Sequence, residues 1–202
     1  MTVKIVVLDT GCCNLTSLCA AIRRLGVEPI VTDEASVARQ ADRLFLPGVG
    51  TAQAAMRELQ KRGLTQCIVG SLCPVLGICL GMQLLGAQSE ESGGVPMLGV
   101  IDQTVSKLQV GELTLPHMGW NRVKLTTNDP LFEGLQNPLG EYFYFVHSYA
   151  YSVNPQTIAT AEYGVEFSAA IRQGNFYGVQ FHPERSGAAG ARLLANFIGG
   201  VQ

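Results

Sequence analysis

Charged side chains are scarce in this chain of 202 residues, because Asp, Glu, Lys and Arg make up only 15% of it, against about 25% in an average domain. The basic residues form no tract, and the formal net charge is −2. Nucleic-acid binding therefore lacks electrostatic support. The low charge and the 47% hydrophobic content favour an α/β fold with a sheet covered on both faces, or a chain that hides surface against a partner.

Long apolar runs are also missing, and no stretch of the sequence approaches the ~18 residues that would span a membrane. Residues 1–9 read as a strand rather than as a charged and then apolar targeting segment. We therefore expect a cytoplasmic protein without membrane contact. The length predicts one domain, residues 1–202, since domains run to roughly 100–200 residues.

Metal-site spacing is absent among the six cysteines, which all lie in the first 79 residues. They are Cys12, Cys13, Cys19, Cys67, Cys73 and Cys79. In a reducing compartment we expect six free thiols, five of them structural, with no disulfide, no metal and no cofactor.

Strand-like and helical segments alternate in the first half of the chain. The expected strands are 3–9, 28–32, 42–50 and 74–78, and the expected helices follow the caps Asn14 and Thr51. This alternation predicts a three-layer, doubly wound, mostly parallel sheet. Short alternating segments from 99 to 182 predict an antiparallel extension of that sheet, and residues 187–200 predict a final helix.

The segment LGICLGMQLLG, residues 76–86, places Cys79 between Gly77 and Gly81. An apolar run precedes Cys79 and helical leucine spacing follows it, so the sequence predicts a tight strand–turn–helix. The two glycines remove side chains that would clash there, as in a nucleophile elbow with cysteine in place of serine. The positive end of the following helix favours a thiolate. The alternative is that Cys79 is a small buried hydrophobic residue.

A thiol nucleophile needs a general base, and the base needs an orienting group. His182 ends an apolar strand and precedes Pro183, and in an extended segment Glu184 shares its face. We therefore predict that His182 is the base and that Glu184 orients it. His147 reads as a structural residue or a pocket wall in the middle of an aromatic strand, and His117 as a loop or interface residue.

An oxyanion hole would complete such a site. The backbone N–H of Leu80 is one expected donor. The Gly48-Val49-Gly50 turn after Pro47 could supply a second, although such a turn alone is more often an ordinary strand-to-helix connection.

Two motifs, GICLGMQ at 77–83 and FHPE at 181–184, together resemble the class I, triad-type glutamine amidotransferases over nearly the whole chain. The segments PGVG at 47–50, HMGWN at 117–121 and YFVHSY at 144–149 resemble a subgroup that supplies ammonia for histidine biosynthesis. The first loop departs from the family pattern, since Thr10 and Cys13 replace a tyrosine and a glycine. The role of that loop, which includes Cys12, is therefore open.

The resemblance implies that Cys79 attacks glutamine to form a thioester, while His182 and Glu184 complete the triad. It also implies that Gln83 and Glu91 bind the polar ends of glutamine and that the backbone of His147, Ser148 and Tyr149 lines the pocket.

The same resemblance implies that ammonia passes to a separate (β/α)₈-barrel cyclase, with which the chain forms a heterodimer. Trp120, Asn121 and Arg185 are the candidates for the surface that faces this partner. Three alternatives stay open: a triad glutaminase of a different synthase, a binding module that has lost its chemistry, and an unrelated cysteine hydrolase.

Overall fold

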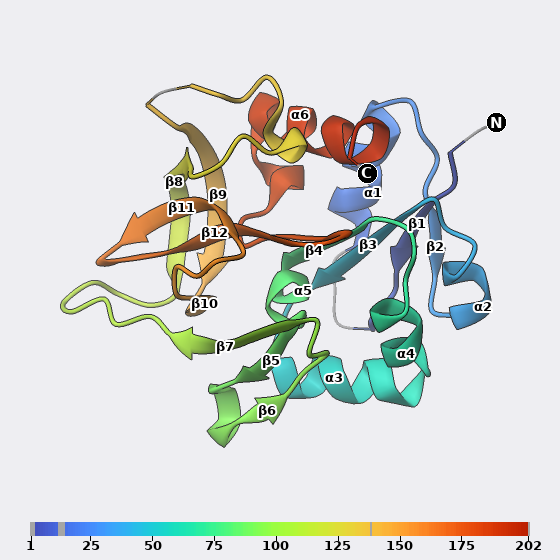
Figure 1. Ribbon diagram of the computed structural model, residues 1–202, viewed down its shortest axis with the longest axis horizontal. Coiled ribbons are helices and arrows are strands. Elements are labelled where there is room, and N and C mark those ends of the chain that lie inside the picture. Colours follow the sequence, from blue (N-terminus) through green and yellow to red (C-terminus); the bar gives the residue numbers. More distant parts are fainter. Residues whose placement is uncertain (1–2, 12–14, 138, 202) are drawn as a thin grey trace.

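A computed structural model describes residues 3–11, 15–137 and 139–201, and a sheet of nine strands forms its centre (Figure 1). The strands are β1 (Ile5–Leu8), β2 (Ile30–Thr32), β3 (Arg43–Gly48), β4 (Val75–Cys79), β8 (His117–Leu125), β9 (Glu141–His147), β11 (Thr157–Tyr163), β12 (Val165–Gln173) and β13 (Phe176–Val179). Their order in the sheet is β2-β1-β3-β4-β13-β12-β11-β8-β9.

The sheet has a parallel part and an antiparallel part, as the sequence predicts, but β13, which the sequence analysis places in the antiparallel extension, pairs in parallel with β4. Strands β2, β1, β3, β4 and β13 pair in parallel. From β13 onward, β12, β11, β8 and β9 pair antiparallel. The parallel part brings strand ends from distant parts of the sequence to one edge.

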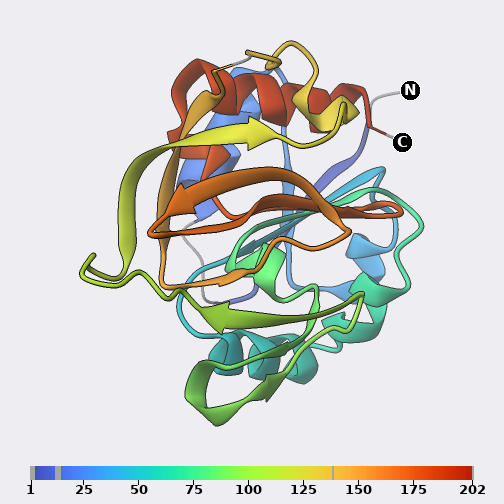
Figure 2. The same ribbon diagram turned by 60° about the vertical axis from the view of Figure 1, so that its left-hand side comes forward.

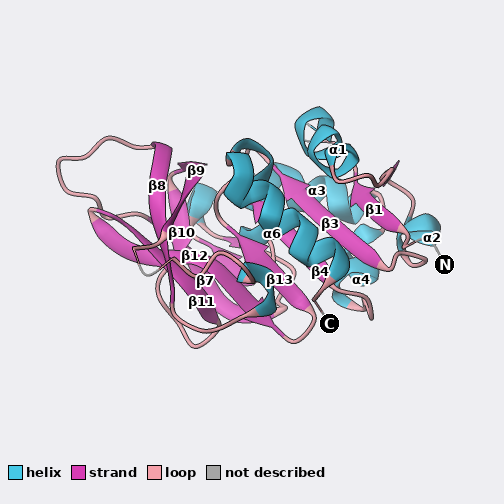
Figure 3. Ribbon diagram, turned by 90° about the horizontal axis from the view of Figure 1, so that it is seen from above, coloured by secondary structure: helices cyan, strands magenta, loops and turns pink. Residues whose placement is uncertain are grey.

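Helices cover both faces of the parallel part, which Figure 3 shows from above. The helices are α1 (Leu15–Arg24), α2 (Ala35–Ala38), α3 (Ala52–Lys61), α4 (Leu64–Val69), α5 (Leu80–Gln83) and α6 (Gly187–Gly199), with 3₁₀ turns η1 (Glu91–Gly93), η2 (Pro130–Phe132) and η3 (Pro183–Arg185). Side chains alternate along β1, so Ile5 and Val7 pack in a core with α1 and α6, and Val6 and Leu8 in a core with α3 and α4. The predicted three layers are therefore present.

A second sheet of four strands corrects the prediction that every later strand extends the central sheet. It consists of β5 (Gly86–Ser89), β6 (Val95–Pro96), β7 (Ile101–Lys107) and β10 (Tyr149–Tyr151), in the order β10-β7-β5-β6. Figure 2 shows its green strands apart from the orange strands of the central sheet. The aromatic segment 142–151 thus serves both sheets, because the chain leaves β9 at His147 and enters β10 at Tyr149.

Local chemistry accounts for the start of the helix that follows β3. Helix α3 begins after Thr51, whose side chain accepts a hydrogen bond from the backbone N–H of Ala54. The predicted cap Asn14 lies outside the described residues. In the described ranges, no helix is long and apolar enough to cross a membrane.

Candidate active site

Cys79 occupies a strained turn between β4 and α5. Its φ and ψ angles are 56° and −114°, and a positive φ is uncommon for a residue with a side chain. The neighbouring glycines are required by close approach: a Cβ on Gly77 would lie 2.6 Å from the Gly81 carbonyl oxygen, and one on Gly81 would overlap the Leu46 carbonyl oxygen. The predicted elbow is therefore present.

The helix after the elbow is shorter than the leucine spacing indicates. Helix α5 covers only Leu80–Gln83, and the chain then enters β5 at Gly86. Since the dipoles of successive peptide units add, one turn of helix contributes only a small dipole. Other groups must contribute to the electrostatics around the Cys79 sulfur.

The carboxyl ends of three adjacent strands meet at Cys79. In the register of the sheet, Gly48 at the end of β3 pairs with Cys79, and Val179 at the end of β13 pairs with Ile78. His182 follows β13 by three residues. Ligand sites in open parallel sheets lie at these strand ends, and here they bring together segments that are distant in sequence.

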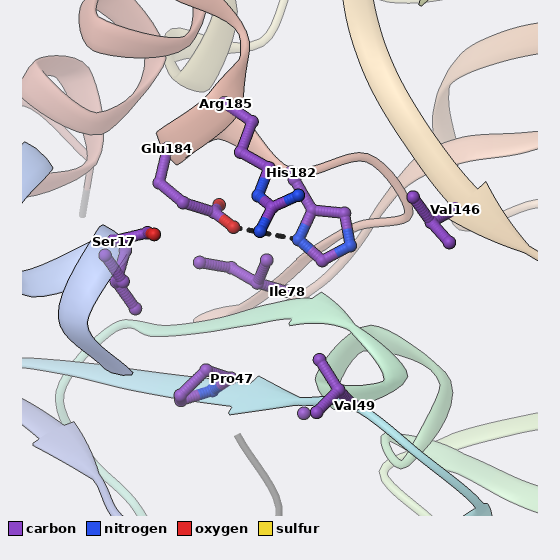
Figure 4. Close-up of a pocket in the computed structure, with 10 residues that line it drawn as sticks. Ser17, Pro47, Val49, Ile78, Val146, His182, Glu184 and Arg185 are labelled. Carbon is purple, nitrogen blue, oxygen red and sulfur yellow. Dashed lines mark hydrogen bonds and ion pairs between the residues drawn. The ribbon is translucent and has the colours of Figure 1, made fainter. Parts of the chain in front are cut away.

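His182 and Glu184 are in contact, because His182 Nδ1 lies 2.8 Å from Glu184 Oε1 (Figure 4). The contact does not arise from the extended geometry that the sequence analysis assumed. His182 has extended angles, but Glu184 lies in the 3₁₀ turn η3 that begins at Pro183. Pro183 begins this turn, since its fixed φ suits the first position of a helix.

His182 carries an unusually stable positive charge. Burial lowers its pKa, but hydrogen bonds with the Cys79 and Glu184 side chains and their charges outweigh burial and raise the pKa to about 10. The imidazole is therefore protonated near neutral pH and lies beside both a thiol and a carboxylate. An imidazolium in this position stabilises a thiolate.

A cavity of about 310 Å³ opens beside Cys79, which is at the lower end of the usual range for ligand pockets. It brings together most of the side chains and backbone segments that the sequence analysis singled out. Its lining includes Val49, Gly50, Cys79, Leu80, Gln83, Glu91, His147, Ser148, Tyr149 and His182.

A smaller cavity of about 180 Å³ lies beside His182 and Glu184 (Figure 4). Gly48 and Val49 line it together with His182, Glu184 and Arg185. Gly48 thus borders the second cavity rather than the one that contains Cys79.

The Tyr149 carbonyl oxygen, at the larger cavity, accepts two side-chain hydrogen bonds. It lies 2.8 Å from Gln83 Nε2 and 3.0 Å from His147 Nδ1. A carbonyl can only accept, so both nitrogens donate to it and both of its lone pairs are used.

His117 is a buried residue and not the loop or interface residue expected from the sequence. It is 3% exposed, and its Nδ1 lies 3.0 Å from His147 Nε2. Since His147 Nδ1 donates to the Tyr149 carbonyl oxygen, the neutral ring accepts at Nε2, so His117 Nδ1 donates to it. The His117 Nε2 then accepts from Asn121 Nδ2, and these two atoms lie 3.3 Å apart. Burial lowers the pKa of His117 to about 4 and that of His147 to about 3, so both rings are neutral at pH 7.

Gln180 is the residue at this site that the sequence analysis missed. Its side chain is fully buried, its Oε1 accepts from Gln83 Nε2 at 2.9 Å, and its Nε2 lies 3.8 Å from Cys79 Sγ. Gln180 stands two residues before His182 at the end of a strand. The two-residue period of extended backbone was the signal that could have placed both side chains on one face.

Glu91 reaches the larger cavity from η1. One of its carboxylate oxygens, Oε2, accepts a hydrogen bond from the backbone N–H of Ala52 at 2.5 Å. Glu91 therefore fixes the start of α3 beside the cavity, where a negative charge is favourable.

The residues expected to face a partner differ in exposure. Trp120 is 56% exposed and Met118, on the same strand, 62%, and Arg185 is also exposed. Asn121 is half-buried, because its side chain also donates to the Glu162 carbonyl oxygen at 2.8 Å.

The cysteines and other metal-binding residue types form no metal centre in the described part of the chain, where no group of three or more His, Cys, Asp or Glu side chains could hold a metal ion. Cys67, Cys73 and Cys79 are among the free cysteines of the described ranges. In the unusual first loop Thr10 is buried, whereas the expectations for Cys12 and Cys13 fall outside the described residues.

Comparison with known proteins agrees with the motifs. The family model for class I glutamine amidotransferases matches residues 6–200. The imidazole glycerol phosphate synthase subunit HisH of Pectobacterium atrosepticum is 58% identical over 195 residues, or 96% of this chain and 98% of that protein. The subunit of the same name from Escherichia coli strain K12 is 59% identical over the same shares.

Solved structures resemble the chain in fold. A candidate GMP synthase subunit from Thermoplasma acidophilum superimposes with a TM-score of 0.77 at 22% identity, covering 98% of this chain and 94% of that one. The resemblance predicted from the sequence motifs is confirmed by the family match, and the chain belongs to the class I glutamine amidotransferase family.

Proposed function

We propose that this chain hydrolyses glutamine to glutamate and ammonia, as the glutaminase subunit of an imidazole glycerol phosphate synthase. The observation that carries the proposal is the elbow cysteine, Cys79, which shares one cavity with His182. The identity of 58–59% to HisH subunits supports the choice of synthase.

The chemistry begins with attack of the Cys79 thiolate on the side-chain carbonyl carbon of glutamine. The protonated His182 then donates its proton to the departing ammonia, and a glutamyl thioester remains on Cys79. Water, deprotonated by the now neutral His182, attacks the thioester and releases glutamate and the thiolate. Glu184 holds His182 through its Nδ1, so that Nε2 faces the reaction.

The surrounding residues would bind and orient the substrate. Leu80 and the 48–50 turn offer backbone N–H groups for the oxyanion. Gln83 and Glu91 would bind the polar ends of glutamine, and the backbone of residues 147–149 would line its pocket.

The ammonia would pass to a (β/α)₈-barrel cyclase subunit in a heterodimer. There it would be used to make imidazole glycerol phosphate and an aminoimidazole carboxamide ribotide, in histidine biosynthesis. Trp120, Asn121 and Arg185 are the proposed partner-facing residues, and the exposure of Trp120 supports that placement.

The test is to compare Cys79→Ala with Cys73→Ala, since Cys73 is a free cysteine outside the described cavity. We expect Cys79→Ala to abolish glutamate release, while its circular dichroism spectrum and a cooperative thermal unfolding transition show that it is folded. The Cys73 variant should keep its activity. Supplied ammonia should still support the cyclase reaction with the Cys79 variant, because that step lies in the partner. Glutamate release by folded Cys79→Ala would overturn the mechanism.

A second candidate is the triad glutaminase of a different synthase, because the class I family match does not itself name the synthase. A candidate GMP synthase subunit shares the fold. At 22% identity that likeness extends to the fold alone. Stable co-purification with a barrel cyclase, and not with another synthase, would separate the two.

A further inference from the structure

Gln180 is a polar side chain with no exposed surface, at the end of an apolar strand. Burying an amide is costly unless both of its ends are hydrogen-bonded. An apolar side chain of similar size would fill this space without that cost. The position therefore calls for a reason beyond packing, and the contacts of the amide give one.

The orientation of the Gln180 amide follows from a fixed acceptor two contacts away. The Tyr149 carbonyl oxygen can only accept, so the Gln83 atom 2.8 Å from it is the nitrogen, Nε2. That same nitrogen lies 2.9 Å from Gln180, so the facing Gln180 atom must be the oxygen. The nitrogen of Gln180 is then the atom directed at Cys79 Sγ, 3.8 Å away.

The surroundings of the sulfur make such a donor useful. The Val146 carbonyl oxygen lies 3.6 Å from Cys79 Sγ, and a carbonyl favours the protonated thiol because it accepts the S–H. An N–H from Gln180 acts in the opposite direction, since it can donate to a thiolate. The short helix α5 adds little, so the donor that follows β13 supplements the charge of His182.

We infer that Gln180 is a further catalytic residue, whose side-chain N–H donates to the Cys79 sulfur and stabilises its thiolate. The inference deepens the proposed function and rests on Cys79 as the nucleophile. Its effect is largest when the sulfur leaves the thioester. At that stage the carbon–sulfur bond breaks, the electron pair returns to sulfur, and a neutral N–H is already aimed at the developing charge.

The experiment measures alkylation of Cys79 by iodoacetamide, a neutral reagent, between pH 6 and 9.5 in the absence of glutamine. The Cys79 peptide is quantified by mass spectrometry, because the other cysteines also react. Gln180→Met removes the donor at similar size. Gln180→Glu keeps an acceptor for Gln83 Nε2 but removes the amide donor. Ser168→Ala is the control, since Ser168 is equally buried and bonds to Thr157 and the Ser152 carbonyl oxygen instead.

We expect both Gln180 variants to alkylate Cys79 about three- to tenfold more slowly at pH 7, with a smaller loss at pH 9.5, because alkylation needs the thiolate and alkaline solution favours a thiolate in every variant. The Ser168 variant should follow the unsubstituted chain at every pH. Equal rates at pH 7, or a loss of the same factor at all pH values, would overturn the inference, because the latter indicates restricted access.

A measurement on the unsubstituted chain covers the case in which neither variant folds. The side-chain N–H resonances of Gln180 should move once iodoacetamide has alkylated Cys79 in the unsubstituted chain, because a thioether is a much weaker acceptor than a thiolate. Unchanged resonances would overturn the inference. Failure of the proposed function is seen separately, as glutamate release by Cys79→Ala, because alkylation requires no glutamine.

Discussion

At the scale of single residues, the charge of His182 couples the site to the stability of the fold. Its pKa is raised from 6.5 to about 10, with burial opposing the shift and the Cys79 and Glu184 contacts causing it. A basic side chain that binds its proton more tightly in the folded protein than in the unfolded protein stabilises the fold. This stabilisation is complete at pH values below the unfolded-state pKa, and it is lost as the pH rises through the folded-state pKa. The stabilisation is therefore complete below about pH 6.5 and is lost towards pH 10.

We predict that His182→Asn destabilises the fold more at pH 6 than at pH 10. The difference between the two conditions should be about 1.4 kcal/mol or more, which corresponds to one unit of pKa. Urea unfolding of both proteins at the two pH values measures it, and the titrating groups that do not contact His182 contribute equally in both chains. Glu184→Gln, which keeps the imidazole, should show a smaller pH dependence than the unsubstituted chain. A destabilisation that grows with pH would contradict the assignment.

Single residues also show how far sequence reasoning extends at the site. Cys79, His182 and Glu184 could be proposed from the sequence because each lies in a short motif whose residue types suit a thiol nucleophile, a base and an orienting carboxylate. The two-residue period could have placed Gln180 on the face of His182, but the contact of Gln180 with Cys79 and the burial of His117 depend on other strands. The N–H of Gln180 reaches Cys79 only because β13 lies beside β4 in the sheet.

At the scale of elements, the elbow depends on two glycines that admit no side chain. We predict that Gly81→Ala destabilises the chain by about 3 kcal/mol or more, because the added Cβ would overlap the backbone of Leu46, and backbone cannot move aside cheaply. Gly77→Ala, which would meet the Gly81 carbonyl, should have a similar effect.

Gly199→Ala is the matched control, since a Cβ there meets nothing within 4 Å. It lies at the end of α6, where alanine is neutral or slightly favourable. Urea unfolding midpoints compare the three variants. Equal midpoints for Gly81→Ala and Gly199→Ala would show that the close approach at the elbow is not limiting.

Elements separate what periodicity can predict from what it cannot. The parallel strands β1 to β4 and the helices α3 and α6 follow from local patterns and a capping residue, whereas the parallel pairing of β13 with β4 does not. The second sheet does not, because apolar alternation is the same in whichever sheet a strand pairs. Residues 142–151 read as one strand, yet the chain divides them between β9 and β10.

At the scale of the whole molecule, the turn after β3 borders the candidate active site on one side and is exposed to solvent on the other. Val49 is 41% exposed while lining both cavities, and Gly50 has a φ of 89°. Glycine allows a peptide unit to rotate at low cost. The backbone N–H of this turn can point into the site or away from it. A free-energy difference of about 1.4 kcal/mol between these two conformations changes the ratio of their populations tenfold.

We therefore predict that the isolated chain releases glutamate slowly and that its partner activates it. An oxyanion donor contributes ~10²–10³-fold to such reactions, so activation of that order is expected. Glutamate release is measured with the chain alone, with the cyclase, and with the cyclase and its ribotide ligand. Gly50→Ala, strained at this positive φ, should change the activated rate more than Gly26→Ala, another positive-φ glycine on a distant turn. Equal rates in the three mixtures would mean that the turn already has its active conformation in the isolated chain, and would contradict activation by the partner.

The one-way order of donors through His117 and His147 has a consequence for the product. An additional proton on the His117 or His147 ring would convert the nitrogen that accepts a hydrogen bond into a donor that faces another donor. At His147, burial and the positive charge of His182 also oppose protonation. The part of the cavity wall formed by His147 therefore offers no acidic imidazolium proton. When ammonia forms, His182 has already given up its proton, so all three histidines are neutral at that moment. Ammonia beside them keeps the lone pair that makes it a nucleophile.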